Sequence, residues 1–207
     1  MAADDDRAPA SDRRPLAYQA VAPPPAEIGE LVAAAVGWVA ARVGVPPDFT
    51  RETLPLVDHY LLESREAIAE RPETLPLVAR AVGAYFGEVI RVHVDTFWIT
   101  PSADAHTWRI AGRTAMFSVN PVGMAWDALV GGADHDGPES TLAVAPEERD
   151  VVDERLARLA PVPEDEFLRL STRLEVLELV AETLRATMQT AGVDDVVFDE
   201  SDYGVVG

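Results

Sequence analysis

The stretch that decides the fold, residues 75–132, reads LPLVARAVGAYFGEVIRVHVDTFWITPSADAHTWRIAGRTAMFSVNPVGMAWDALVGG. Its first part predicts an amphipathic helix from Leu75 to Val92, because apolar side chains recur at alternating steps of three and four residues. Gly83 and Gly87 lie inside this helix, where each glycine costs about 1 kcal/mol relative to alanine. We therefore expect a neighbouring backbone to approach the helix closely at the glycines.

After this helix the pattern changes to one that is typical of β-strands. Aromatic and β-branched residues are frequent in Thr96 to Thr100, His106 to Ala111 and Thr114 to Asn120, and turn residues separate the three segments. They predict three antiparallel strands in a meander. An Asn120-Pro121 turn then opens a short helix, which Gly131-Gly132 ends.

The rest of the chain adds four predicted helices to this centre. They cover Ala26 to Val43, about Thr53 to Glu70, Pro146 to about Ala160, and Glu164 to Thr190. The sequence thus predicts one α+β domain, residues 26–192, with a small antiparallel sheet of about three strands packed with about six helices. A candidate fourth strand, Val196 to Phe198, lies in the acidic C-terminal tail, residues 193–207. Residues 1–25 are rich in proline, alanine and aspartate and predict a disordered arm, from which Leu16, Tyr18 and Val21 could dock on the domain.

Two sequence patterns bear on architecture and assembly. The motif ETLPLV occurs at Glu52 to Val57 and again at Glu73 to Val78. Two copies are too few for a stacking repeat and indicate two similar helix starts, with threonine as the N-cap and proline in the first turn. The last predicted helix carries a coiled-coil-type apolar seam from Phe167 to Met188. Packing of this seam along the domain is the commoner arrangement, and a homodimer through it is the alternative.

Composition excludes several classes of chemistry and partner. The chain has no cysteine and no lysine, which removes disulfides, thiolate metal sites, Schiff-base chemistry and the lysine of a phosphate-binding loop. With 36 acidic and 17 basic residues the net charge is -19, which disfavours nucleic acids and acidic membranes. No apolar run is long enough to span a bilayer and the N-terminus is acidic, so we expect a cytoplasmic protein. The charge favours a basic protein partner, although solubility or a GC-rich genome would also explain it.

Three groups of residues are candidates for chemistry. Glu88 lies in the central predicted helix, where a buried carboxylate needs a partner such as Arg109 or Arg113, or else has a raised pKa. It is a candidate catalytic acid or base, and the alternative is a structural glutamate that ties helix to sheet. His59 and Glu63, next to Asp58, lie one helical turn apart and could hold a metal or form an acid–base pair, or could simply belong to a solvated helix surface.

The third group is the loop that follows residues 131–132. Asp134, His135 and Asp136 could ligate a cation, although their spacing differs from the calcium-loop pattern. The alternative is a flexible polar loop, Ala133 to Ala145. No other motif in the sequence predicts a cofactor or a nucleotide.

The segment Ala84 to Ile90, the strand tryptophan Trp98 and the Asn120-Pro121 turn resemble a group of small uncharacterised bacterial proteins with a "GxYxGEV … W … NP" pattern. The likeness covers roughly residues 50–132, including the preceding LVDHYL segment. It implies a bacterial α+β domain of unknown function and brings no site residues. This chain has Asp95-Thr96-Phe97 where that group has glycines before the tryptophan, so the turn is expected to differ.

These observations favour a non-enzymatic interaction domain that binds a basic partner, such as an adaptor, an immunity-type inhibitor or a secretion chaperone. The candidate interaction residues are Tyr85, Glu88, Trp98 and Trp108. The alternative function is a metal-assisted or acid–base hydrolase in which Glu88 acts with a histidine. It predicts that Glu88 and one of His59, His93, His106 or His135 share one pocket.

Overall fold

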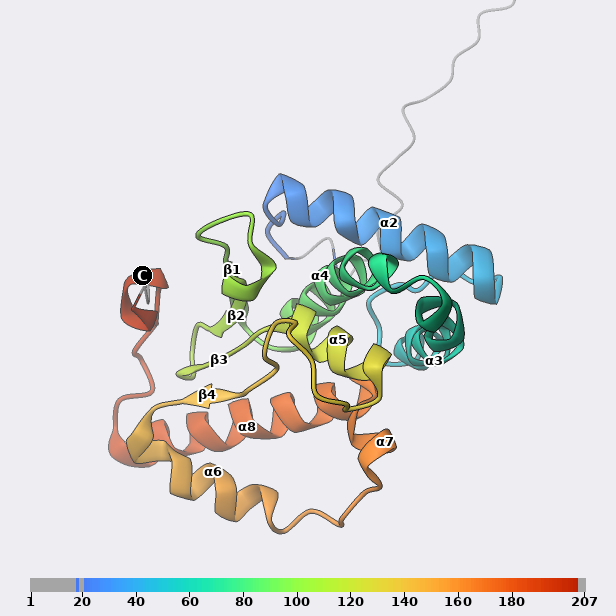
Figure 1. The fold of residues 1–207 in the computed structure, drawn as a ribbon. Coiled ribbons are helices and arrows are strands. Elements are labelled where there is room, and N and C mark those ends of the chain that lie inside the picture. Colours follow the sequence, from blue (N-terminus) through green and yellow to red (C-terminus); the bar gives the residue numbers. More distant parts are fainter. Residues whose placement is uncertain (1–17, 19–20, 205–207) are drawn as a thin grey trace, which may run out of the picture.

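The structure is a computed structural model that describes Tyr18 and residues 21–204. The described part is an α+β fold of seven α-helices and a four-stranded antiparallel sheet, as the sequence predicts in class. The sheet lies on one side of the molecule and the helices α2, α3, α4 and α5 on the other, while α8 runs beneath them (Figure 1).

Helix α4, Leu75–His93, is the centre of the fold. Every residue from 81 to 90 is buried, and the neighbours of the helix include α2, α5, β1 and α8. A helix that is covered on all sides is typical of a domain core. The expected close approach is confirmed at Gly83, because a Cβ atom there would lie 2.5 Å from the Cα atom of Val122 in α5. At Gly87 the neighbour is instead a side chain, the indole of Trp98.

The sheet has the strand order β1-β2-β3-β4, with every neighbouring pair antiparallel. Its strands are β1 Thr96–Ile99, β2 Arg109–Gly112, β3 Phe117–Val119 and β4 Ala143–Val144. The second strand begins later than predicted, since a 3-10 turn, η2 Ala105–Thr107, replaces its start. Asp104 stabilises this turn by accepting a hydrogen bond from the backbone N–H of His106 at 3.0 Å.

The fourth strand does not come from the C-terminal tail as predicted. β4 pairs with β3 instead, and the structure assigns no strand to Val196 to Phe198. This segment makes one backbone hydrogen bond to the sheet region, from Phe198 N to Arg113 O at 2.8 Å. The tail then forms η4, Glu200–Tyr203, and the Tyr203 hydroxyl donates to the carbonyl of Gly112.

Helices α2 and α3 lie before the central helix. Their bounds are Ala26–Val43 and Leu54–Glu70. The two ETLPLV motifs both contain a helix start, at Leu54 of α3 and at Leu75 of α4, with proline in the first turn. The expected threonine caps do not form: Thr53 donates to Asp48 and Thr74 donates to the Arg71 carbonyl.

The predicted last helix is divided into two. The helices after α4 are α5 Pro121–Val130, α6 Arg149–Leu156, α7 Glu164–Phe167 and α8 Leu170–Ala191. The break falls at Leu168-Arg169, where Asp58 of α3 accepts hydrogen bonds from the first N–H groups of α8. All seam residues from Leu170 to Met188 are buried within the chain, whereas Phe167 is 46% exposed. The homodimer through this seam stays a prediction.

The N-terminal arm is described in part. The described residues do not include 1–17, 19 and 20, so the prediction for Leu16 lies outside them. Tyr18 is buried, and its ring stacks on Phe49 with the centroids 3.9 Å apart. Phe49 adopts a left-handed backbone conformation, φ 67°, which is uncommon for a bulky residue. The hydroxyl of Tyr85 accepts a hydrogen bond from the N–H of Phe49 at 2.9 Å.

Candidate functional site

Glu88 is the candidate acid or base in α4, and the structure makes it part of a closed polar cluster. It is fully buried, and both of its oxygens accept hydrogen bonds from Arg91, at 2.8 and 3.0 Å. The indole N–H of Trp98 in β1 donates to the same carboxylate at 2.6 Å. The prediction that Arg109 or Arg113 pairs with Glu88 is wrong. The partner is Arg91, which lies one turn along the same helix. The cluster ties helix to sheet, which is the structural alternative of the sequence analysis.

Three of the four histidines contact groups other than Glu88, and the fourth is exposed. His93 contacts the carbonyl of Phe49 at 3.1 Å, His59 lies 3.6 Å from Glu63, and His135 lies 2.8 Å from Asp127. His106 is exposed. The shared pocket that the hydrolase hypothesis requires is therefore not formed around Glu88 in the described part of the chain.

The four candidate interaction residues are mostly internal. Tyr85, Glu88 and Trp108 are buried, and Trp98 is partly exposed. Burial raises the pKa of the Tyr85 hydroxyl, which stays protonated at neutral pH. Tyr85, Glu88 and Trp108 contribute to the core, whereas Trp98 also reaches the surface. A role of these residues in binding a partner stays a prediction.

The helix group Asp58, His59 and Glu63 has two different roles. His59 and Glu63 are on the α3 surface, where Glu63 also accepts a hydrogen bond from Arg42 at 2.9 Å. Asp58 accepts hydrogen bonds from the backbone N–H of Leu170 at 2.7 Å and from the hydroxyl of Ser171 at 2.6 Å. Burial raises the pKa of Asp58 although these hydrogen bonds act in the opposite direction. Asp58 thus caps a helix that is distant in sequence.

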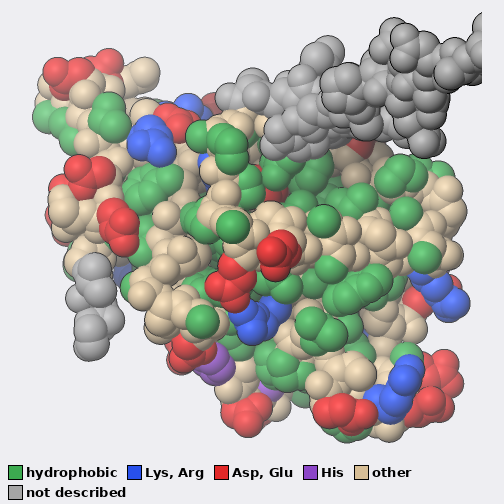
Figure 2. Space-filling model, turned by 90° about the horizontal axis from the view of Figure 1, so that it is seen from above, with side chains coloured by type: hydrophobic (Ala, Val, Ile, Leu, Met, Phe, Trp, Pro, Cys, Tyr) green, Lys and Arg blue, Asp and Glu red, His purple; other side chains and the backbone are tan. Residues whose placement is uncertain are grey.

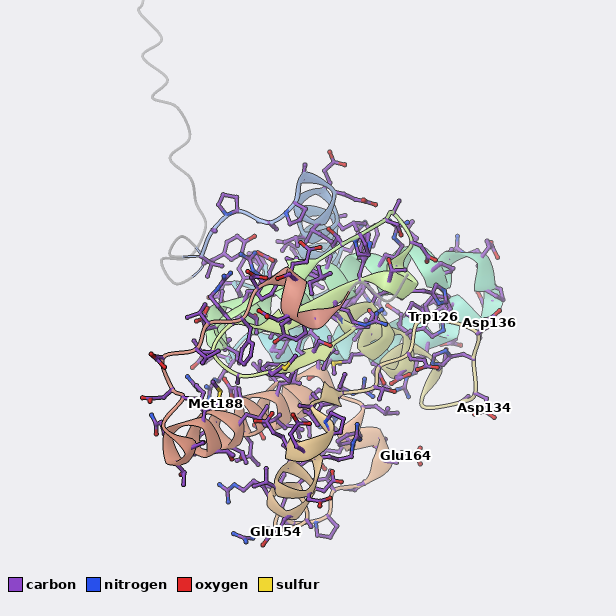
Figure 3. The ribbon with its side chains drawn as sticks, turned by 90° about the vertical axis from the view of Figure 1, so that its left-hand side faces the viewer. Trp126, Asp134, Asp136, Glu154, Glu164 and Met188 are labelled. Carbon is purple, nitrogen blue, oxygen red and sulfur yellow. The ribbon has the colours of Figure 1, made fainter. Side chains whose placement is uncertain are left out.

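The loop group Asp134, His135 and Asp136 does not converge. Asp134 lies at the outer end of the loop after α5 and points away from the body of the protein (Figure 3). His135 turns inward to Asp127 of α5, while Asp134 and Asp136 are exposed. Among the described residues no group of three or more His, Cys, Asp or Glu side chains is placed to hold a metal ion.

This loop packs on α5, and its flexibility stays a prediction. A Cβ atom at Gly137 would lie 2.4 Å from the indole of Trp126, and one at Gly123 would lie 2.5 Å from the carbonyl oxygen of Glu139. The absence of side chains at two glycines therefore lets the loop contact the helix directly. Sequence alone does not show which distant glycines will face each other.

Asp127 is the centre of a polar network that joins α5, the loop and α8. One oxygen accepts from His135 Nε2 at 2.8 Å, and the other accepts from Ser140 Oγ at 2.5 Å and from Arg173 Nη2 at 2.8 Å. The backbone N–H of Gly137 donates to His135 Nδ1, so Nε2 is the protonated nitrogen that donates to Asp127. Burial alone would raise the pKa of Asp127, but these hydrogen bonds and the charge of Arg173 hold it below its usual value.

A groove of about 760 Å³ lies next to this network. Its walls come from α8, from residues 140–142 and from the segment between α6 and α7, which loops outward beneath α8 (Figure 1). The lining is mainly apolar, and three large apolar side chains at its edge are exposed: Leu159 at 47%, Val162 at 44% and Phe167 at 46%. Exposed apolar side chains that gather in one hollow are typical of a binding site.

Two charged residues line this groove, the buried Arg173 and the exposed Glu175. Arg173 is 6% exposed, and its guanidinium lies 5.7 Å from the centre of the Phe167 ring. Only Nη2 has an acceptor, since the buried Nε and Nη1 atoms make no hydrogen bond with the described residues. A buried donor without an acceptor costs about 1–3 kcal/mol. The sequence carries a signal for this residue, because Arg173 follows Leu170 by three positions and precedes Leu177 by four, on the apolar face.

A second hollow, of about 490 Å³, is acidic. It lies between α2 and the start of α4 and is lined by Glu27, Glu30, Glu73, Leu77 and Arg80 among others. Arg80 donates to Glu27 at 2.6 Å, whereas Glu30 and Glu73 have no basic partner among the described residues. Leu77 is 55% exposed. The view onto the top of the molecule shows carboxylates near exposed hydrophobic side chains (Figure 2).

The comparisons with known proteins bring no relative to this site. No protein-family model, no curated protein and no solved structure matches the chain. The resemblance to the bacterial "GxYxGEV … W … NP" group stays a prediction. None of the described helices is long and apolar enough to cross a bilayer. The assignment of function therefore depends on the geometry of the two hollows.

Proposed function

We propose that this chain is a non-enzymatic interaction domain that binds a basic protein partner through the acidic hollow between α2 and α4. The observation that carries the proposal is the pairing of two uncompensated carboxylates, Glu30 and Glu73, with the exposed side chain of Leu77. An arginine or lysine of a partner fits this chemistry, because its charged end can meet the carboxylates while its apolar stem covers the leucine. An adaptor, an immunity-type inhibitor or a secretion chaperone would use such a surface.

The net charge of -19 supports the same partner class. A large negative net charge raises the association rate with a basic protein and lowers it with an acidic one. Affinity should then fall as salt is added, because the Debye length decreases from about 10 Å at 0.1 M to about 3 Å at 1 M.

The test is capture of partners from lysate of the source organism at low salt, with the double variant Glu30→Gln, Glu73→Gln beside the wild type. The control is Asp194→Asn, Asp195→Asn, which removes the same two charges from exposed positions in the C-terminal tail. We expect a basic protein that the wild type and the control retain, that the hollow variant loses, and that salt elutes. Equal retention by all three proteins, or a partner whose affinity does not change with salt, contradicts the proposal.

A further inference from the structure

We infer that the groove beside Arg173 is a binding site for a small amphipathic acyl ligand, whose carbonyl or carboxylate oxygen accepts the free N–H groups of Arg173 and whose hydrocarbon chain lies along the apolar wall. This site is on a different surface from the acidic hollow and does not depend on the protein partner. Three features support this site: the size of the groove, the unsatisfied donors and the local charge.

The groove has the dimensions of a small-molecule site. Its volume of about 760 Å³ falls within the range of roughly 300–1,000 Å³ that is common for such sites. The apolar wall is formed by Val176, Leu177 and Leu179 of α8 together with the segment that carries Leu159 and Val162. A hydrocarbon chain placed here would remove the exposed surface of Leu159 and Val162 from water, which is favourable.

The unsatisfied donors specify an acceptor. The guanidinium has five N–H groups, and the one at Nε and the two at Nη1 have no acceptor among the described residues. Arg173 lines the groove, so a ligand oxygen there lies next to its guanidinium, and the two buried nitrogens can form these hydrogen bonds after a movement of the side chain. Phe167 covers the guanidinium at 5.7 Å and protects such hydrogen bonds from water.

Local charge sets the kind of head group. Asp127 already compensates the charge of Arg173 at 2.8 Å, so a neutral carbonyl oxygen satisfies the donors without adding charge. A carboxylate oxygen can make the same hydrogen bonds and makes them stronger, but Glu175, which also lines the groove, repels its charge. A cationic head group has donors and no acceptor, so it cannot accept a hydrogen bond from Arg173, even though the net negative charge of the protein attracts cations. The shared requirement is an oxygen acceptor on an apolar chain.

The test uses three probes with the same chain: decanoate, methyl decanoate and decylammonium. Isothermal titration calorimetry measures affinity and stoichiometry, and NMR shift changes locate the site. We expect saturable one-to-one binding of decanoate or methyl decanoate and much weaker binding of decylammonium. The tighter of the two acceptors identifies the source as a free acid or as an esterified acyl chain. No saturable binding, or decylammonium binding as tight as that of the acceptors, overturns the inference.

Two sets of variants examine the proposed contacts. Arg173→Lys keeps a positive charge near Asp127 but lacks the guanidinium fork, and it should weaken the acceptor probes by at least about tenfold. Leu159→Asp, Val162→Asp places charge on the exposed apolar wall and should abolish binding without touching the core. The matched control is Val45→Asp, Leu62→Asp, which places two charges on exposed apolar side chains that do not line the groove and should bind as the wild type does. Unchanged affinity in both groove variants would overturn the inference of an acyl site. The proposal of a basic protein partner is tested separately, by the Glu30→Gln, Glu73→Gln variant.

Discussion

Alanine at position 83 tests how tightly the two central helices pack. A Cβ atom on Gly83 would lie 2.5 Å from the Cα atom of Val122 and 2.9 Å from the carbonyl oxygen of Pro121. Both are backbone atoms of α5, so no change of rotamer can move them aside. To reach an ordinary contact of 3.4 Å the two helices must separate by 3.4 minus 2.5, roughly 0.9 Å.

The expected loss follows from this separation. A gap of 0.5–1 Å removes about a quarter to a half of the dispersion attraction between facing atoms, and overpacking typically costs about 1–3 kcal/mol. The higher helix propensity of alanine offsets about 1 kcal/mol of this loss. The start of α5 is fixed by Asn120, which accepts from the N–H groups of Val122 and Gly123, so the clash is not easily relieved. We therefore expect the free energy of unfolding to fall by about 1–2 kcal/mol.

The assay is urea unfolding followed by circular dichroism. The control is Gly37→Ala in α2, where an added Cβ atom meets nothing within 4 Å. This variant should gain about 1 kcal/mol, because only the propensity changes. The same substitution thus has opposite signs at the two positions. If Gly83→Ala is as stable as the wild type while Gly37→Ala gains stability, the close packing of α4 on α5 is refuted.

Three further variants test the polar contacts. The pKa of Asp127 is lowered, so its ionised form stabilises the fold above about pH 4, and this contribution is lost as the pH falls further. Asp127→Asn should therefore flatten the acid side of the curve of stability against pH. An unchanged curve would contradict the hydrogen-bond network around Asp127. Asp58→Asn should lower the urea midpoint by an amount equivalent to about 1–2 kcal/mol, because an amide cannot accept all the N–H groups at the start of α8. A midpoint like that of the wild type would show that this helix does not need the cap. Glu88→Gln should cost about 3 kcal/mol in the same assay, since Arg91 remains buried without its counter-charge, and a cost under about 0.5 kcal/mol would argue against the buried pair.

The sequence predicts most helices because their signals are local. The apolar period in residues 75–92 and the proline at the start of each ETLPLV helix are properties of one segment. The break at Leu168-Arg169 is not local, since the apolar alternation continues through it and the capping carboxylate of Asp58 comes from another helix. The strand β4 was missed for a related reason. It has two residues, Ala143–Val144, and exists only because β3 lies beside it.

The candidate sites also separate into features that a single segment reveals and features that depend on distant residues. A glutamate inside an apolar helix is visible in the sequence, so Glu88 could be identified as a residue that needs partners. Which partner is nearest depends on side-chain direction, and Arg91 was closer than the two strand arginines that the sequence suggested. The groove is beyond such reasoning, because its walls come from α8, from residues 140–142 and from the segment between α6 and α7.

Glu88 and Arg173 are both charged residues on buried helix faces, and the difference between them leads to the last prediction. The carboxylate of Glu88 is satisfied by Arg91 and Trp98, so its removal should only destabilise the protein. Arg173 has one acceptor and two nitrogens without any among the described residues. Replacing it by methionine removes these donors and leaves Asp127 with two hydrogen bonds.

Arg173→Met also removes the counter-charge of a carboxylate, but it should cost less in urea unfolding than Glu88→Gln, because the Asp127 side chain is 15% exposed and keeps its hydrogen bonds from His135 and Ser140. In the same variant we expect the acyl probes to lose their affinity, since the oxygen acceptor no longer has a donor. A residue that contributes little to stability but much to binding is typical of a functional position. If Arg173→Met instead unfolds the protein as readily as Glu88→Gln does, the guanidinium is part of the core, and its unsatisfied donors no longer argue for a ligand.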